Sequence, residues 1–342
     1  VARDSPLRSG ASGRGRRKVL EPVKVGVVGI GNMGVHHARV YSELPQTELV
    51  GVVDVNEARG RICSDRYHTQ FFSSYRDLFE RVEAVNIVAP TIFHYELAME
   101  FLARDIHVLV EKPITVDLIQ AKRLVDYAKK RNLVLQVGHL ERFNPAVGKL
   151  REVLGRPIHL ESHRLSYPTN RNLDVGVVWD LMIHDLDILI NLVNSPVVEI
   201  NAVGVSVYSD FEDIAQVHLL FKNGTAASLM ASRVSGERLR QLKITEDTGR
   251  TLCLDFINQN LSILRPPSNG YPMAPEFVQL EKKEPLRLEL SHFADCVATH
   301  KTPLVTGEDG KRALELAMQV LARMKIVKSK APLPNDLIAL AG

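Results

Sequence analysis

Asp180 and His184 stand four residues apart in the apolar stretch VVWDLMIHDLD, Val177 to Asp187. In a helix, this spacing places the two side chains on one face. A histidine beside a carboxylate keeps a defined tautomer and a pKa near neutrality, as acid–base catalysis requires. The stretch offers no water-facing stripe, so the helix should be buried, where ionisable groups need partners. We predict that a substrate site supplies those partners.

Two other interpretations of this pair stay open. The pair could belong to a polar cluster at a domain junction that performs no chemistry. It could also bind zinc together with a third ligand such as His163. No H-E-x-x-H-type spacing accompanies the pair, so we expect no metal.

A second group of candidates lies in VLVEKPIT, where Glu111, Lys112 and Pro113 follow an apolar run typical of a strand. A lysine at a strand end is often simply solvated. Here Pro113 fixes the backbone directly after it, and the Lys112–Pro113 peptide bond is a candidate for the cis form. Oxidation of an alcohol requires the hydroxyl proton to pass to a base or to be held by a cation. Lys112 has the chemistry for either role.

The stretch VGVVGIGNMGVHHARVY contains a complete G-x-G-x-x-G motif between a predicted strand and a predicted helix. Gly29 allows a tight turn, Gly31 lets a pyrophosphate approach the backbone, and Gly34 lets the helix pack closely on the strand. The helix N-terminus then faces the phosphates. A glycine-rich turn without a ligand is the alternative. We predict a dinucleotide site at Gly29, Ile30, Gly31, Asn32, Met33 and Gly34.

Asp54 ends the second predicted strand, 20 residues after Gly34. A carboxylate at this position can bind the ribose hydroxyls of a dinucleotide. It would repel a ribose 2′-phosphate by about 4 kcal/mol, for unit charges ~4 Å apart at an effective dielectric constant of ~20. We therefore expect NAD rather than NADP as the cofactor, although Arg59 lies close enough in sequence to weaken this argument.

Thr91 and His94 follow the fourth predicted strand in APTIFHYE, at the edge where open parallel sheets bind ligands. We expect Thr91 near the nicotinamide half of the cofactor. His94 has two interpretations, a cofactor contact or a cap on its own helix. Together with the glycine motif, Asp54, Glu111 and Lys112, these two residues complete the predicted cofactor site.

The elements that must position these residues fall into two parts. Residues 23–138 alternate β-branched runs such as VKVGVVG and ELVGVVD with amphipathic segments, which is typical of a doubly wound parallel α/β sheet. After Arg142, hairpin signals such as Lys222-Asn223-Gly224 join several extended runs and predict an antiparallel sheet. We expect extended runs at 197–208, 213–222, 225–234, 239–245 and 250–265, a strand at 159–166, and helices at 144–154, 286–299 and 308–327.

With 342 residues the chain is too long for one ordinary core,. We predict a flexible basic tail (1–20), a Rossmann domain (21–141) and an α+β domain (142–342). The second domain should hold a large open, mostly antiparallel sheet, and its C-terminal helix, 308–327, should pack back on the Rossmann domain.

Charge and composition exclude several classes of protein. Residues 1–18 hold six basic residues and one acidic residue, so the net charge of +3 falls to about −2 for the rest of the chain. This balance does not favour nucleic-acid binding. No apolar run reaches the ~18 residues that a membrane span requires. The three cysteines are widely spaced without a C-x-x-C pair, which favours free thiols and a cytoplasmic location.

Five motifs, GIGNMGVHHARVY, APTIFHYE, EKPIT, VGHLERFNP and WDLMIHDLD, occur in the order and at the separations found in one enzyme family. From about residue 23 to 327, the chain resembles the glucose-fructose oxidoreductase, inositol dehydrogenase and MocA family (Gfo/Idh/MocA). The resemblance implies that Lys112, Asp180 and His184 form the catalytic group. It also implies that the second domain builds the substrate pocket and commonly the oligomer interface. Trp179 departs from the pattern, because many members have a small residue there, and it makes a simple free-sugar substrate less certain.

The motif VGHLERFNP resembles most closely a branch that acts on nucleotide-linked amino sugars, the UDP-N-acetylglucosamine 3-dehydrogenases. For such a substrate, arginines can fork onto the diphosphate and Tyr167 can stack on a sugar or base. Ion pairs between the domains are the alternative for Arg142 and Arg171. The predicted substrate site comprises Lys112, His139, Arg142, Asn144, Arg164, Tyr167, Arg171, Trp179, Asp180 and His184.

We thus predict an NAD-dependent dehydrogenase that oxidises a secondary sugar hydroxyl, C3 of a UDP-linked N-acetylhexosamine. We favour His184, oriented by Asp180, as the base, because its reference pKa of ~6.5 needs less adjustment than the ~10.4 of Lys112. Lys112 would then polarise the oxygen. The alternatives are an inositol or free-sugar dehydrogenase, an NADPH-dependent carbonyl reductase, and a non-catalytic dinucleotide-binding sensor. The alternating segment HLLFKNGTAASLMAS also favours a homo-oligomer, a dimer or tetramer formed through the second sheet.

Overall fold

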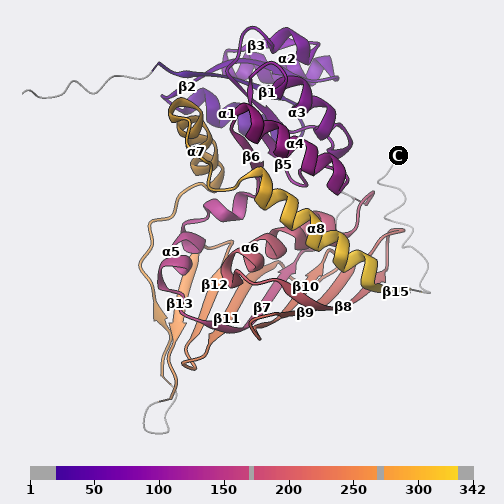
Figure 1. The fold of residues 1–342 in the computed structure, drawn as a ribbon, viewed down its shortest axis with the longest axis vertical. Helices are drawn as coiled ribbons and strands as arrows, with labels where there is room; N and C mark the ends of the chain where they lie inside the picture. The colour runs from indigo at the N-terminus through magenta and orange to yellow at the C-terminus, as the bar shows by residue number, and fades with distance from the viewer. Residues whose placement is uncertain (1–20, 169–172, 268–272, 330–342) are drawn as a thin grey trace, which may run out of the picture.

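The computed structural model describes residues 21–168, 173–267 and 273–329 of the chain. These residues form two sheets with helices between and around them, as Figure 1 shows. Within the described residues, no helix is both long and apolar enough to cross a membrane. The predicted tail, residues 1–20, lies outside the described part.

The first sheet has six strands in the order β3-β2-β1-β4-β5-β6, all parallel. This is the doubly wound order of a dinucleotide-binding fold, as predicted. Of the six strands in this sheet, β3, which has three residues, is the one that the sequence analysis did not predict. The strands are β1 (Val23–Val28), β2 (Thr47–Val53), β3 (Gln70–Phe72), β4 (Ala84–Ile87), β5 (His107–Glu111) and β6 (Leu135–Gly138), and the helices are α1 (Gly34–Glu43), α2 (Glu57–Tyr67), α3 (His94–Leu102) and α4 (Leu118–Arg131).

Helices from both ends of the chain cover this sheet. On one face, α1 and α7 (Pro285–Thr299) pack Tyr41 and Phe293 against the strands. On the other face, α3, α4 and α8 (Gly307–Arg323) contribute Phe101, Leu124 and Leu314 to a second core. The strands are therefore buried on both sides, which explains their nearly continuous apolar sequence.

The second sheet has nine strands in the order β14-β13-β12-β11-β7-β10-β9-β8-β15. All neighbours are antiparallel except the β7–β10 and β8–β15 pairs, so the predicted mostly antiparallel sheet is confirmed. The strands are β7 (Pro157–Leu165), β8 (Val197–Ser206), β9 (Ile214–Phe221), β10 (Ala226–Ser232), β11 (Leu239–Glu246), β12 (Thr251–Asp255), β13 (Asn260–Leu264), β14 (Glu276–Phe277) and β15 (Met324–Lys328). The predicted run 250–265 is thus two strands joined by a turn.

Within the described residues, helices cover one face of the nine-stranded sheet and not the other. These are α5 (Pro145–Val153), α6 (Ile183–Val193) and α8, which lie between the two sheets in Figure 1. The side chains of β9 show the consequence, because Ala215 and Val217 are buried while Gln216 and His218 are exposed. We call the face that carries Gln216 and His218 the open face.

Helix α8 contacts both sheets. Thr306 and Asp309 form a capping box at its start,. Gly307 and Gly310 lie so close to Leu135 and Val137 of β6 that a Cβ on either would crowd those side chains. The helix therefore packs on the first sheet while Val320 fills the core of the second.

The predicted helix 308–327 is wrong for its last four residues. Helix α8 ends at Arg323, and Met324 to Lys328 form β15, which pairs in parallel with β8 at the edge of the sheet. β-Branched residues such as Ile326 and Val327 favour strands. An edge strand with unpaired backbone groups was available to receive them.

Candidate active site

Lys112 lies at the carboxyl end of β5, and the Lys112–Pro113 peptide bond is cis, as the sequence suggested. Its Nζ donates a 2.7 Å hydrogen bond to the carbonyl oxygen of Asp180 and lies 3.7 Å from the Asp180 carboxylate. Burial lowers the pKa of Lys112 below its ordinary value, although the carboxylates of Asp180 and Glu111 oppose that shift,. The ammonium group of Lys112, from the first sheet, thus lies beside the carboxylate of Asp180, from the second part of the chain.

Asp180 lies in a π-helical turn, Val178–Met182, that continues directly into α6. The sequence predicted an ordinary helix here. Such turns are rare and often occur at functional sites. The backbone of this turn is anchored by Glu212, whose carbonyl oxygen accepts from Val177 N and whose carboxylate accepts from Val178 N, both at 3.0 Å.

His184 follows on α6, and its ring stands perpendicular to that of His139, with 6.5 Å between the ring centres. Its Nδ1 is buried without a hydrogen-bond partner, and no hydrogen bond joins Asp180 to His184 among the described residues. Burial lowers the pKa of His184 well below its ordinary value, and the positive charges of Lys112 and Arg164 lower it further. The imidazole is therefore neutral at pH 7 and able to accept a proton.

The glycine turn between β1 and α1 has the geometry that a bound pyrophosphate needs. Gly29 has a positive φ of 93°, and a Cβ there would lie 2.7 Å from the backbone of Val88. A Cβ on Gly34 would overlap the carbonyl oxygen of Gly29, whereas one on Gly31 would project into open space. Helix α1 begins without a capping side chain or an acidic residue in its first turn. The N-terminus of α1 and the space above Gly31 therefore fit a dinucleotide,.

Asp54 is already hydrogen-bonded on both carboxylate oxygens. It accepts from Ile30 N at 2.6 Å and Asn56 N at 2.7 Å, and Arg59 forks onto it at 2.8 and 3.2 Å. Burial alone would raise the pKa of Asp54, but Arg59 and the two backbone amides hold it below its ordinary value. The carboxylate is therefore ionised, and Arg59 neutralises part of its charge.

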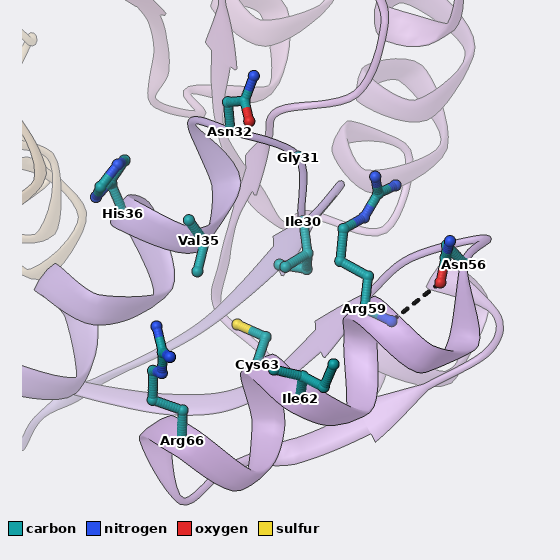
Figure 2. Close-up of a pocket in the computed structure, with 10 residues that line it drawn as sticks. All are labelled: Ile30, Gly31, Asn32, Val35, His36, Asn56, Arg59, Ile62, Cys63 and Arg66. Carbon is teal, nitrogen blue, oxygen red and sulfur yellow. Dashed lines mark hydrogen bonds between the residues drawn. The ribbon is translucent and has the colours of Figure 1, made fainter. Parts of the chain in front are cut away.

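A pocket of about 630 Å³ opens beside the glycine turn, between α1 and α2. Figure 2 shows that Arg59 and Arg66 extend from α2 on either side of Cys63, with His36 and Val35 on α1 opposite. Such a pocket at the end of a parallel sheet suits the adenosine half of a dinucleotide. Its lining residues are Ile30, Gly31, Asn32, Val35, His36, Asn56, Arg59, Ile62, Cys63 and Arg66.

Two of the remaining expected cofactor residues, Glu111 and His94, contact the Lys112–Pro113 segment. Glu111 lies 3.2 Å from Nε2 of His37 and accepts from the backbone N–H of Lys112 at 3.3 Å. His94 is buried and connects the carbonyl oxygens of Ala89 and Pro113, each 2.8 Å from a ring nitrogen. It therefore braces the end of β4 against the cis-proline loop rather than capping its own helix. Thr91 begins the short turn η2 (Thr91–Phe93), and contacts of Thr91 and His94 with a cofactor stay predictions.

Three of the residues that we expected to bind the substrate already contact other residues of the protein. Arg142 is buried and lies 3.3 Å from Asp187, an ion pair within residues 142–342 rather than between the two predicted domains. Arg164 is only 2 % exposed and forks onto Asp185 at 2.8 and 3.0 Å. Asn144 caps α5 and donates to the carbonyl oxygen of Phe256. Substrate contacts by these residues stay untested.

The other expected substrate residues differ in exposure. His139 is buried beside His184, Tyr167 is exposed, and Trp179 packs between the cores of the two parts. Arg171 lies outside the described residues. The sequence analysis did not single out Arg240 on β11, which lies beside Arg164 in the sheet register. Its alternation with Leu242 and Ile244 indicated the core face of the strand,, but the strand that lies beside β11 could not be predicted.

The zinc interpretation finds no support in the geometry. His163 pairs with Glu161 at 3.1 Å, and both alternate with the buried Ser162 and Arg164, so they lie on the open face. In the described ranges, no three His, Cys, Asp or Glu side chains converge as a metal site requires,.

Two family models match the chain, one for each sheet. The model of an oxidoreductase family with an NAD-binding Rossmann fold matches residues 23–139. The model of the Gfo/Idh/MocA C-terminal domain matches residues 147–251. The chain belongs to the Gfo/Idh/MocA family.

Individual relatives within the Gfo/Idh/MocA family are similar over nearly the full length. The UDP-N-acetylglucosamine 3-dehydrogenase of Acidithiobacillus ferrooxidans is 37% identical over 303 residues, which are 87% of this chain and 96% of the relative. A solved structure of that enzyme, GnnA, has a TM-score of 0.83 at 36% identity and covers 89% of this chain and 98% of its own. The scyllo-inositol 2-dehydrogenase (NAD(+)) of Bacillus subtilis is 28% identical over 86% of this chain and 92% of the relative.

As a Gfo/Idh/MocA oxidoreductase, the chain has the groups that oxidation of a hydroxyl requires. A neutral imidazole can accept the proton, and an ammonium group can hold the oxygen. The ammonium group lies at the carboxyl end of β5, the end of the sheet where the glycine turn follows β1, and its charge acts on the imidazole.

Proposed function

We propose that this protein oxidises the C3 hydroxyl of a UDP-linked N-acetylhexosamine, with NAD as the hydride acceptor. The observation that carries the proposal is the meeting of Lys112 with Asp180, one helical turn before the neutral His184. The 37% identity with a UDP-N-acetylglucosamine 3-dehydrogenase supports this substrate class. Inositol dehydrogenases also occur among the relatives, so an inositol is the competing substrate.

The roles of the three residues follow from their surroundings. His184 accepts the hydroxyl proton on its imidazole as the C=O bond forms, while the C–H electron pair leaves as hydride. Lys112, kept cationic by Asp180, holds the substrate oxygen as negative charge develops on it,. A bound dinucleotide would supply the hydride acceptor, held by the glycine turn and Asp54.

The choice of NAD over NADP rests on the ionised Asp54 at the edge of the adenosine pocket. Its charge opposes a ribose 2′-phosphate, and the salt bridge to Arg59 reduces that opposition without removing it,. We therefore expect NAD to be preferred by a modest factor rather than NADP to be excluded.

A substrate screen tests the proposed function. UDP-N-acetylglucosamine, free N-acetylglucosamine, hexoses and inositols are each incubated with NAD or NADP, and formation of the reduced nicotinamide is followed by absorbance. We expect the highest kcat/KM with UDP-N-acetylglucosamine and NAD. Turnover of an inositol or free sugar alone would contradict the proposed substrate, and cofactor binding without any turnover would favour a sensor.

We also propose a homo-oligomer, a dimer or tetramer, that assembles through the open face of the nine-stranded sheet. This face carries apolar side chains such as Val203 and Leu220 among polar ones, a mixture common in protein interfaces. A cytoplasmic location stays a prediction from the three cysteines, all of which are free.

A further inference from the structure

Arg240 lies beside Arg164 on the helix-covered side of the sheet. The two residues are register neighbours on β11 and β7, so their side chains lie on one face,. Arg164 is satisfied, because Asp185 and Glu141 both bind it within 3.0 Å. Arg240 lies 3.8 Å from Glu141, the carboxylate that Arg164 already holds more closely. Its side chain is 35 % exposed, so it is a cation with room for a further partner.

The surroundings of Arg240 place it next to the catalytic helix. Arg164, its neighbour, binds Asp185, the residue directly after His184. Glu141 belongs to the turn η3 (Leu140–Phe143), which directly follows His139, whose ring faces His184. The positive charge of Arg240 is also among the groups that lower the pKa of His184.

The charges around Arg240 leave an excess of positive charge. Two arginines, Arg164 and Arg238, act on Arg240 together with two carboxylates, Glu141 and Asp185. Arg238 is exposed and stands two residues before Arg240. An anion bound here would balance the excess, whereas a neutral sugar or inositol would not.

We propose that Arg240 binds the diphosphate of a nucleotide-sugar substrate. A guanidinium group presents paired donors that match phosphate oxygens, and such charge-assisted bonds are stronger than neutral ones. The proposal rests on the proposed substrate class and names the residue that selects it. It also assigns different roles to two arginines on neighbouring strands. Arg164 holds the catalytic helix through Asp185, and Arg240 binds the ligand.

Direct binding of UDP tests this role without turnover. UDP is titrated calorimetrically into the enzyme saturated with NADH, so that the phosphate cradle of the glycine turn is already occupied. We expect Arg240→Gln to weaken UDP binding by about tenfold or more and Arg240→Lys to weaken it less, because lysine keeps the charge but loses the fork. Arg265→Gln is the matched control, since Arg265 is exposed and paired with Glu276, and it should bind UDP normally.

Kinetics separate this role from a structural one. Arg240→Gln should raise KM for UDP-N-acetylglucosamine by about tenfold and leave kcat nearly unchanged. Uridine, which has no phosphate, should bind equally to both proteins. Wild-type affinity for UDP in Arg240→Gln, or no UDP binding by the wild type, would overturn the proposal.

The proposed function and this inference can fail separately. If the wild type oxidises UDP-N-acetylglucosamine and Arg240→Gln keeps the same KM, only the role of Arg240 fails. If the wild type oxidises no nucleotide sugar, yet Arg240→Gln loses UDP affinity, only the proposed reaction fails. Circular dichroism and Tm establish that each variant is folded, and Arg240→Lys decides the question if Arg240→Gln is not.

Discussion

At the scale of single residues, the active site depends on ionisable groups whose partners come from distant segments. Lys112 is held by Asp180, and the unpaired imidazole of His184 stands in a positive field. Burial, helped by this field, lowers the pKa of His184 and keeps the imidazole neutral, while Asp180 and Glu111 oppose the effect of burial on the pKa of Lys112. The roles of His184 as base and Lys112 as cation stay predictions, and Asp180 is bound to Lys112 rather than to His184, the residue that we expected it to orient.

Replacement of His184 tests the assignment of the base. In the wild type, kcat/KM should fall as the pH drops through the pKa of His184, which lies below 6.5, because protonation removes the acceptor,. His184→Ala should lower kcat/KM by about 10²- to 10⁴-fold and lose this acid limb. The measurement is the pH dependence of kcat/KM in both proteins. An unchanged profile in His184→Ala would make Lys112 the base instead.

Glu289 on α7 offers a test of stability against pH. It is fully buried, and neither carboxyl oxygen has a hydrogen-bond partner in the described part of the chain. Burial raises its pKa well above the ordinary value, and the charge of Glu111 raises it further. Glu289 therefore keeps a proton that the unfolded chain loses at about pH 4.5.

Because the folded state binds this proton more tightly, its contribution to stability is complete below about pH 4.5 and is lost as the pH rises towards the folded pKa. Glu289→Gln removes the titration and keeps the shape. The mutant should gain stability over the wild type by up to about 1.4 kcal/mol per pH unit in that window. Denaturant unfolding from pH 5 to 8 measures the difference, and the exposed Glu281→Gln is the control. A difference that does not vary with pH would show that Glu289 is ionised.

At the scale of elements, the glycine turn and the helical segment that carries Asp180 and His184 could be predicted because their signals are local. The G-x-G-x-x-G spacing indicates the turn between a strand and a helix, and the i, i+4 pair indicates one face of a helix; each pattern depends only on residues close together in sequence. The partner of an arginine is not local, since Arg142 pairs with a residue 45 positions away. The strand β15 was missed for the same reason, because only the distant edge of β8 turns that segment into a strand.

The glycine turn gives a matched pair of substitutions. Gly34→Ala places a Cβ on the carbonyl oxygen of Gly29 and should lower Tm and abolish NADH binding,. Gly31→Ala projects into open space, so Tm should stay within a few degrees while NADH binds at least about tenfold more weakly, since the methyl group enters the phosphate site,. Thermal unfolding and NADH fluorescence measure both. Normal NADH affinity in Gly31→Ala would contradict the predicted phosphate position.

At the scale of the whole molecule, the nine-stranded sheet has one face covered by helices and one face that the described part of the chain leaves open. Val203, Gln216 and Met230 lie in one row across the open face, by the register of β8, β9 and β10. The row mixes apolar and polar side chains, and we expect a second copy of the chain to cover it.

A charged substitution in that row tests whether the open face is the oligomer interface. Val203 is 45 % exposed, so Val203→Lys should leave the fold intact and shift the protein from oligomer to monomer, because a buried unpaired charge opposes assembly. Light scattering after size exclusion gives the mass. Ile257→Lys, at an exposed turn between β12 and β13, is the control and should stay assembled. A wild-type mass equal to one chain would contradict the proposed interface.

The Rossmann sheet is completed by helices that the chain reaches last. Phe293 of α7 closes the core on one side and Leu314 of α8 closes it on the other, although the six strands end at Gly138. During synthesis, both faces therefore remain partly uncovered until the nine-stranded sheet has almost been made. We therefore expect the cofactor half to become fully stable only once the rest of the chain has been made,.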